Sequence, residues 1–378
     1  MRARSIRLLC LCACTVAFTG CRGKERAENA APAATAPATA APATAPRPPV
    51  PAVRCLVHDE PKAPIDPRDL DDLTGAAQRI ANMLRGETGL PLWNLLDPQV
   101  RDESRRERFL ANLDTVAARV RRSGSATVER VLLLEVAPGI RGPMKITCPG
   151  PDGPWTVATR VDGANLALAY LAFDGDPLPP RLVVRLRRGA KGWNLLGIES
   201  TAHRYRGVDA PAYLARAEAA HTAGRPVEAY LDAGIAQVLS MRGRGVTTPL
   251  SERVAQFLAK GRAAAAAQRA IAKALDLPPD RIVSVGLFNT EFDLAPRIRC
   301  VTKVGDLRDE PRLRKESARL ADALVQRIPA LARTFDTVVF EAVETRPATP
   351  GAPVDVARMA VKIAERPPAD PPAPAPGG

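Results

Sequence analysis

Apolar side chains recur every three or four residues in two segments, which is the spacing of one face of a helix. The first segment spans residues 69–86 and ends at Gly86, and the second spans residues 102–121. The apolar positions are Leu70, Leu73, Ala77, Ile80, Ala81 and Leu84 in the first segment, and Phe109, Leu110, Leu113, Val116, Ala117 and Val120 in the second. The pattern predicts two amphipathic helices that each bury one face.

From residue 128 the pattern changes to short apolar and β-branched runs separated by turn signals such as Asp162-Gly163. The predicted strands are 128–136, 144–148, 155–161, 166–173, 182–186 and 193–199. Helices followed by an antiparallel meander predict an α+β domain over residues 66–205.

Residues 206–278 are rich in alanine and predict a helical connector. Within it, residues 212–241 resemble one tetratricopeptide-like hairpin, with a turn at 223–226. A single unit is more typical of an ordinary helical hairpin, because repeat arrays need about three copies. A long helix is predicted over 250–276.

A third block, residues 279–365, predicts a ββαββ module. Its segments are strand 281–288, strand 293–303, helix 309–333, strand 336–345 and strand 354–364. In the last strand Ala357, Met359 and Val361 share one face, whereas Arg358 and Lys362 lie on the other. The chain as a whole is therefore predicted to be α+β.

The first residues have the pattern of an export signal. Arginines at positions 2, 4 and 7 precede an apolar run, Leu8 to Phe18, which is too short to span a bilayer as a helix because that needs about 20 residues. The end of the run, Phe18-Thr19-Gly20-Cys21, resembles the lipobox of bacterial lipoproteins. The resemblance implies a signal peptide over 1–20, diacylglycerol on the Cys21 thiol and an acyl chain such as palmitate on the new amino group. The alternative is an ordinary cleaved signal followed by a chance cysteine.

Composition then indicates a tether. Residues 29–53 are nearly all Ala, Pro and Thr, with too little apolar bulk to offset the entropy of ordering. We expect residues 21–65 to form a disordered tether and residues 366–378 a disordered tail. In the lipoproteins that the signal resembles, an Asp directly after the cysteine favours the inner membrane, so the resemblance implies that Arg22 directs the protein to the outer membrane. We expect the protein to face the periplasm there.

The closing strands of the first domain carry a second resemblance. Leu182-Val183-Val184-Arg185-Leu186 runs through Gly192-Trp193 into Leu195-Leu196-Gly197-Ile198. This hairpin resembles the nuclear transport factor 2-like (cystatin-like) superfamily, whose members place N-terminal helices against a curved sheet and often enclose a pocket. The resemblance implies the same fold for 66–205, with Tyr170, Trp155 and Trp193 as candidate pocket residues that could equally be core.

The seven cysteines divide by position. Three leave with the signal and Cys21 carries lipid, so Cys55, Cys148 and Cys300 remain. An exported protein can oxidise them, and three allow at most one intrachain bridge. A Cys55–Cys148 disulfide is favoured, and three reduced, buried thiols are the alternative.

Candidate chemistry is sparse. The three histidines fit no zinc-site spacing, and no phosphate-binding glycine loop or nucleophile elbow is present. His58-Asp59-Glu60 has ligand character but is more typical of a solvated polar run. No catalytic residue, metal site or cofactor is predicted.

Charge adds little. The chain has 54 Lys and Arg against 41 Asp and Glu, a formal net charge of +13. Such a protein can meet anionic lipid, cell-wall polymer or acidic partners, and nucleic acid is not expected in the envelope. The sequence therefore predicts a non-enzymatic envelope lipoprotein, held in the membrane by its anchor, that binds or assembles an envelope protein or cell-wall partner. The alternative is a small-ligand carrier or enzyme with a pocket in 66–205.

Overall fold

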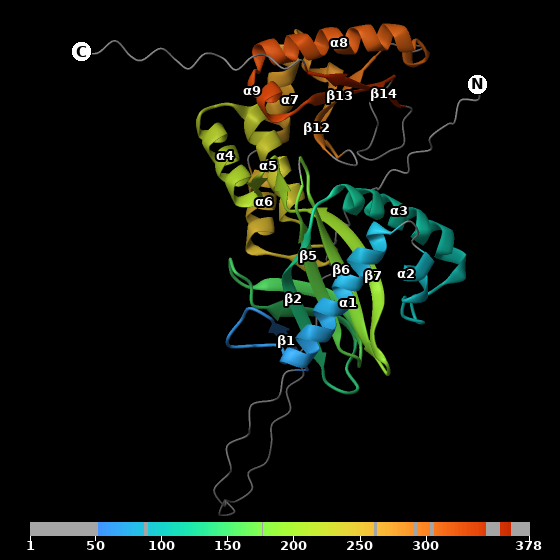
Figure 1. Ribbon diagram of the computed structural model, residues 1–378. Coiled ribbons are helices and arrows are strands. Elements are labelled where there is room, and N and C mark those ends of the chain that lie inside the picture. The colour runs from blue at the N-terminus through green and yellow to red at the C-terminus, as the bar shows by residue number, and fades with distance from the viewer. Residues whose placement is uncertain are drawn as a thin grey trace, which may run out of the picture. The chain divides into compact units, whose positions relative to one another are not determined.

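The computed structural model describes residues 52–363, apart from 87–89, 176, 261–262, 290–292, 303–305 and 345–355 (Figure 1). The predicted signal, Cys21, most of the predicted tether and the predicted tail lie outside the described residues. The α+β class is confirmed. The helices are α1 Pro67–Arg85, α2 Leu90–Asn94, α3 Arg106–Arg122, α4 Ala210–Thr222, α5 Pro226–Ser240, α6 Pro249–Lys260, α7 Ala263–Ala274, α8 Glu310–Arg327 and α9 Ala330–Thr334.

Strands of the first half form two sheets. They are β1 Val53–Val57, β2 Ala126–Val136, β3 Arg141–Cys148, β4 Trp155–Asp162, β5 Leu166–Phe173, β6 Pro180–Gly189 and β7 Gly192–Ala202. One antiparallel sheet has the order β1-β2-β5-β6-β7, and β3 and β4 form a second sheet with β10, Val246–Thr247. Two more short strands, β8 Arg204–Tyr205 and β9 Val208–Asp209, make a tight hairpin.

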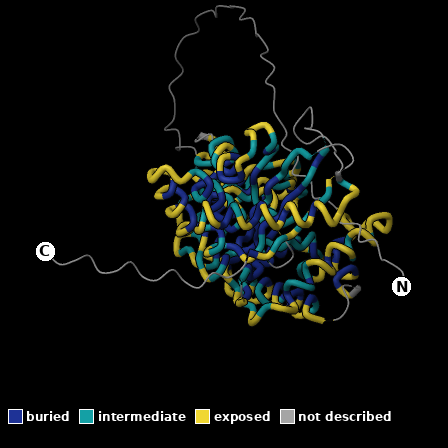
Figure 2. The backbone as a smooth tube through the Cα atoms, turned by 90° about the horizontal axis from the view of Figure 1, so that it is seen from above, coloured by how far each residue is buried: buried dark blue, intermediate teal, exposed yellow. Residues whose placement is uncertain are grey.

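Two apolar layers lie on the faces of the five-stranded sheet. Figure 1 shows α1 lying along this sheet, and Figure 2 shows that the buried residues gather in the interior of the fold. Helices α1, α2 and α3 cover one face, where Leu73 of α1 and Leu113 of α3 lie in the same apolar layer as Leu133 of β2. The β3–β4 hairpin covers the other face, with Trp155 and Ile146 in that layer. The central sheet is therefore buried on both sides.

The simple meander predicted from the sequence differs from this arrangement. The hairpin of β3 and β4 leaves the main sheet, and β2 pairs with β5 instead. The burial patterns give the reason. Strand β5 is apolar on both faces and nearly all buried, which suits the middle of a sandwich. Strand β3 alternates exposed and buried residues, which suits an outer layer.

Within the predicted tether, which runs to residue 65, the described residues already include a strand. Residues Val53–Val57 form β1, which pairs along β2 from Val53↔Val136 to Val57↔Leu132. Apolar side chains of this strand reach both layers, since Leu56 packs on the helix side and Val57 on the hairpin side. A disulfide joins Cys55 of β1 to Cys148 of β3.

The connector helices and the last sheet share one apolar core, which includes Ile235 of α5, Ile271 of α7 and Leu324 of α8. The sheet has the order β11-β12-β13-β14, with β12 and β13 parallel across α8. Its strands are β11 Ile282–Asn289, β12 Leu294–Val301, β13 Thr337–Val343 and β14 Val356–Lys362. The segment predicted as one helix over 309–333 is two, α8 and α9, because Ile328 precedes Pro329 and leaves the helical conformation, with φ −134° and ψ 71°.

Glu341, fully buried, lies under an arginine cluster on this sheet. Arg299 and Arg358 each donate to its carboxylate at 2.7 Å, and the Arg297 Nε lies 4.0 Å away. Burial alone would raise the Glu341 pKa, but the hydrogen bonds from Arg299 and Arg358 and the charge of Arg297 hold it below its ordinary value. The carboxylate therefore stays ionised and holds three cations together.

Within the described residues, every helix is too short or too polar to cross a membrane.

Candidate functional site

A cavity of about 230 Å³ lies between the two sheets of the first half. Two of the residues singled out in the sequence, Tyr170 of β5 and Trp155 of β4, meet there with their rings edge to face, 5.9 Å apart. Its charged lining consists of Glu129 and Arg130 of β2, Asp59 after β1 and Arg242 after α5. The site is thus assembled from segments that span nearly 190 residues of sequence.

Tyr170 carries the first unusual feature of the cavity. Its side chain is 1% exposed, yet its hydroxyl has no hydrogen-bond partner among the described residues. Burial raises the pKa of the phenol above its ordinary value, so the group stays a neutral O–H donor. Buried hydroxyls nearly always find a partner because leaving one unsatisfied costs about 1–3 kcal/mol.

Trp155 forms the wall against which the charged groups pack. Its indole N–H donates to the Asp152 carboxylate at 3.0 Å. The guanidinium carbons of Arg130 and Arg242 lie 5.1 and 5.8 Å from its ring centroid, within cation–π range. Gly150 packs so closely on the ring that a Cβ there would lie 2.2 Å from it. The indole is therefore held in one place.

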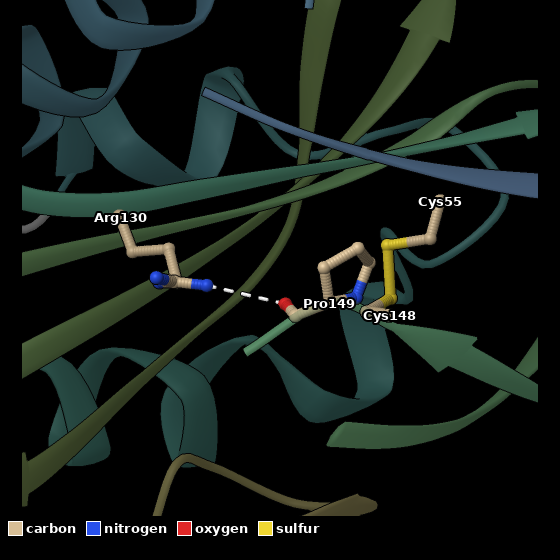
Figure 3. The surroundings of a disulfide bond; sticks show 4 residues. All are labelled: Cys55, Arg130, Cys148 and Pro149. Atoms are coloured by element: carbon tan, nitrogen blue, oxygen red, sulfur yellow. Dashed lines mark hydrogen bonds between the residues drawn. A yellow bond between two sulfur atoms is a disulfide. The ribbon is translucent and has the colours of Figure 1, made fainter. Parts of the chain in front are cut away.

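Arg130 is neutralised and held by two partners. Its Nη2 lies 2.6 Å from the Asp59 carboxylate, and its Nη1 donates to the Pro149 carbonyl at 3.2 Å (Figure 3). Pro149 directly follows Cys148, so the disulfide to Cys55 fixes the segment that holds this arginine.

Glu129 and Arg181 form a second neutral pair at the edge of the cavity, with Arg181 Nη2 donating to Glu129 at 2.8 Å. Burial would raise the Glu129 pKa, but the hydrogen bonds and charge of Arg181, with Arg242 and His203 nearby, lower it on balance. The carboxylate is thus ionised and already engaged by Arg181.

Arg242 is the arginine of the cavity lining that has no described counter-ion. Its Nη1 donates to the Leu239 carbonyl at 3.1 Å, but its buried Nε has no partner and no described carboxylate pairs with it. Burial, with the charge of Arg181, lowers the pKa of Arg242 to about 10. A largely buried guanidinium without a counter-ion is costly, and it faces the same cavity as the Tyr170 hydroxyl.

The loop that carries Arg242 is fixed to the hairpin sheet. Strand β10 pairs with β4 through Val246↔Val157 and Thr247↔Thr156. Gly245 has a positive φ of 74°, and a Cβ there would lie 2.4 Å from the Ala158 carbonyl oxygen. A glycine is therefore needed for this close approach.

Trp193, the third candidate pocket residue, lies elsewhere. It packs against the layer filled by the helices, on the face of the sheet opposite Tyr170, and Arg188 lies 5.2 Å from its ring. Leucine and alanine side chains fill that layer.

Several pocket residues were missed in the sequence. Asp59 stood in the polar run His58-Asp59-Glu60, and its role depends on Arg130, 71 residues away. Arg242 lies in the predicted connector, directly before Gly243-Arg244-Gly245, and no motif surrounds it. The position of each residue depends on contacts with distant parts of the chain, which no short sequence motif indicates. Among the described residues, no three His, Cys, Asp or Glu side chains are placed to hold a metal ion.

Comparisons with known proteins identify no relative of the chain. No protein-family model, no curated protein and no solved structure matches the chain.

Proposed function

We propose that the protein is a lipid-anchored protein of the bacterial cell envelope with a non-catalytic binding role, and that its Tyr170 pocket receives a small anionic ligand. Anchoring through Cys21, an outer-membrane location facing the periplasm and membership of the nuclear transport factor 2-like superfamily are parts of this proposal. The Cys55–Cys148 disulfide supports export, because such bonds persist in oxidising compartments.

One observation supports an anionic ligand in the Tyr170 pocket. Tyr170, whose buried hydroxyl has no partner among the described residues, and Arg242, whose guanidinium is partly buried and has no described counter-ion, line the same cavity. A bound anion would accept from both groups and supply the missing negative charge, and charge-assisted hydrogen bonds of this kind are stronger than neutral ones.

The cavity limits the size of the ligand. At about 230 Å³ it is below the range of about 300–1,000 Å³ found for drug-sized ligands. A carboxylate or phosphate group on a small body fits this volume, with the Trp155 ring available to an apolar part. Catalysis is not proposed, because the Tyr170 hydroxyl has no base within hydrogen-bond distance among the described residues.

We expect sodium phosphate or sodium benzoate to raise the melting temperature of the full-length protein in detergent, at constant ionic strength. Titration calorimetry should show that Arg242→Gln weakens binding by roughly 10-fold or more, since hydrogen bonds to charged groups are worth about 1.5–3 kcal/mol. Tyr170→Phe should weaken it by about 3- to 10-fold, because it removes one donor.

Arg244→Gln is the matched control, since this exposed arginine stands two residues along the same loop and does not line the cavity. Its affinity should stay within about twofold of the parent. If Arg242→Gln and Arg244→Gln lower the affinity for the anion equally, or if neither anion binds to the parent protein, the pocket is not an anion site.

The anchor has a separate test. Cells given labelled palmitate should incorporate label into the parent protein, and Cys21→Ser should abolish incorporation and release the protein from the membrane fraction. Continued labelling of Cys21→Ser would mean that the lipid is elsewhere, and an unlabelled parent would mean that the signal is simply cleaved.

A further inference from the structure

A second hollow, of about 530 Å³, lies among α4, α5 and α9 and shares no lining residue with the Tyr170 pocket. We call it the α4–α5–α9 groove. Buried apolar side chains of Tyr213, Leu231, Leu331 and Phe335 form part of its lining. Its volume is within the range of specific ligand sites.

Guanidinium groups dominate the charged lining of this groove. Four arginines line it against two carboxylates, those of Glu228 and Asp232. The arginines are Arg206, Arg216, Arg225 and Arg333. Because they come from the β8–β9 turn, α4, the start of α5 and α9, the positive charge surrounds the hollow on several sides.

The pairing of these arginines leaves some of them available. Arg333 is exposed and forms no ion pair with a described residue. Arg216, half-exposed, lies 3.4 Å from Asp232, beyond a good hydrogen bond. Burial raises the pKa of Asp232 to about 6 despite Arg216. The 3.4 Å separation from Asp232 leaves the Arg216 guanidinium able to bind an incoming carboxylate as well. Arg225 pairs with Glu228 at 2.6 Å, so a ligand carboxylate would share that guanidinium.

Arg206 is held in place at the cost of backbone strain. Its φ of 50° lies in the left-handed region, which costs a non-glycine residue about 1–2 kcal/mol. Its side chain pairs with Asp336 at 2.6 Å, and its Nε lies 3.3 Å from the Tyr205 hydroxyl oxygen. The guanidinium is therefore positioned before any ligand arrives.

We propose that the α4–α5–α9 groove binds an extended acidic segment of a partner protein. Ligand carboxylates would bind Arg216, Arg225 and Arg333, and an apolar ligand side chain would lie on the floor near Leu331. A polypeptide fits better than a lipid surface, because Glu228 and Asp232 in the wall can accept backbone N–H groups between the ligand's carboxylates, and the phosphodiester of an anionic lipid has no such donor. The groove shares no lining residue with the Tyr170 pocket, so either proposal can fail its test without the other.

The test uses a fluorescein-labelled peptide of alternating glutamate and leucine with the full-length protein, followed by fluorescence anisotropy. Arg225→Gln combined with Arg333→Gln should weaken binding by roughly 10-fold, at about 0.5–1 kcal/mol for each exposed charge contact. A photo-crosslinking version of the peptide should label α4, α5 or α9. The glutamine version of the peptide should bind far more weakly.

Arg269→Gln is the matched control, because this exposed arginine lies on α7 and does not line the groove. An equal loss in Arg269→Gln would show attraction to net charge alone and overturn the proposal. So would crosslinks outside the groove. Vesicles of phosphatidylglycerol and phosphatidylcholine serve as a second probe. If the parent protein binds these vesicles but not the peptide, and the groove variants bind the vesicles more weakly, the groove is a lipid site and the proposal is overturned.

Discussion

Replacing Cys148 with serine is expected to lower the free energy of unfolding by about 4 to 5 kcal/mol in the chain-entropy model. The disulfide closes a loop of sequence separation 93 between β1 and β3, and longer loops restrict the unfolded chain more. Chemical denaturation of the oxidised parent and of the variant measures the difference. The same variant should also bind pocket anions more weakly, because Pro149, which follows Cys148, holds Arg130.

Two further variants make this prediction specific. Cys300→Ser exchanges the same atom at a free, half-buried thiol and should cost about 1 kcal/mol or less. Cys55→Ser combined with Cys148→Ser should be no less stable than either single variant, since one bond is lost in each case. If Cys148→Ser unfolds at the same denaturant concentration as the parent, the bond contributes nothing to stability.

Replacing Glu341 with glutamine should destabilise the protein by about 3 kcal/mol. Removing one partner of a buried ion pair costs about 3–5 kcal/mol, and the lower end applies because the arginines around Glu341 are partly exposed. Glutamine keeps the shape but leaves three guanidinium groups without their shared carboxylate. Glu316→Gln, in the exposed pair with Arg319 on α8, is the control and should cost under about 1 kcal/mol.

The Glu341 cluster also predicts a pH dependence. Because the folded pKa of Glu341 is held below its ordinary value of 4.5, the stabilisation is fully present above that pH and is lost as pH falls through the lower folded pKa. Denaturation curves measured from neutral to acidic pH should therefore converge for the parent and Glu341→Gln. Parallel curves across that range would mean that another group controls the acid response.

The sequence predicted the elements better than their arrangement. Strand β5 was bounded correctly as 166–173, because its apolar run is continuous and ends at turn signals. Its position in the middle of the sheet could not be read from that run, since burial on two faces depends on what the β3–β4 hairpin covers. In the same way, Val53–Val57 was assigned to a tether, because its five residues follow an Ala- and Pro-rich segment.

The site was predicted in part. Tyr170 and Trp155 were named as aromatic residues of the sheet half, and they meet at one cavity. Trp193 was named with them but faces the opposite layer, because one side of a strand alternates with the other and the sequence does not say which side holds the cavity. Arg242 could not be predicted, because its place depends on β10 pairing with a strand nearly 90 residues earlier.

Helix α5 links the two proposed binding regions. Its first half carries Glu228 and Asp232 of the α4–α5–α9 groove, and Arg242 follows its last residue by two positions. At about 1.5 Å per residue the helix is roughly 22 Å long, so the regions lie at opposite ends of one rigid element. If a ligand at one end shifts this helix, thermodynamic reciprocity requires that the other ligand change the first affinity by the same factor. Titrating the anion with and without the acidic peptide, and then the reverse, would measure that coupling free energy twice.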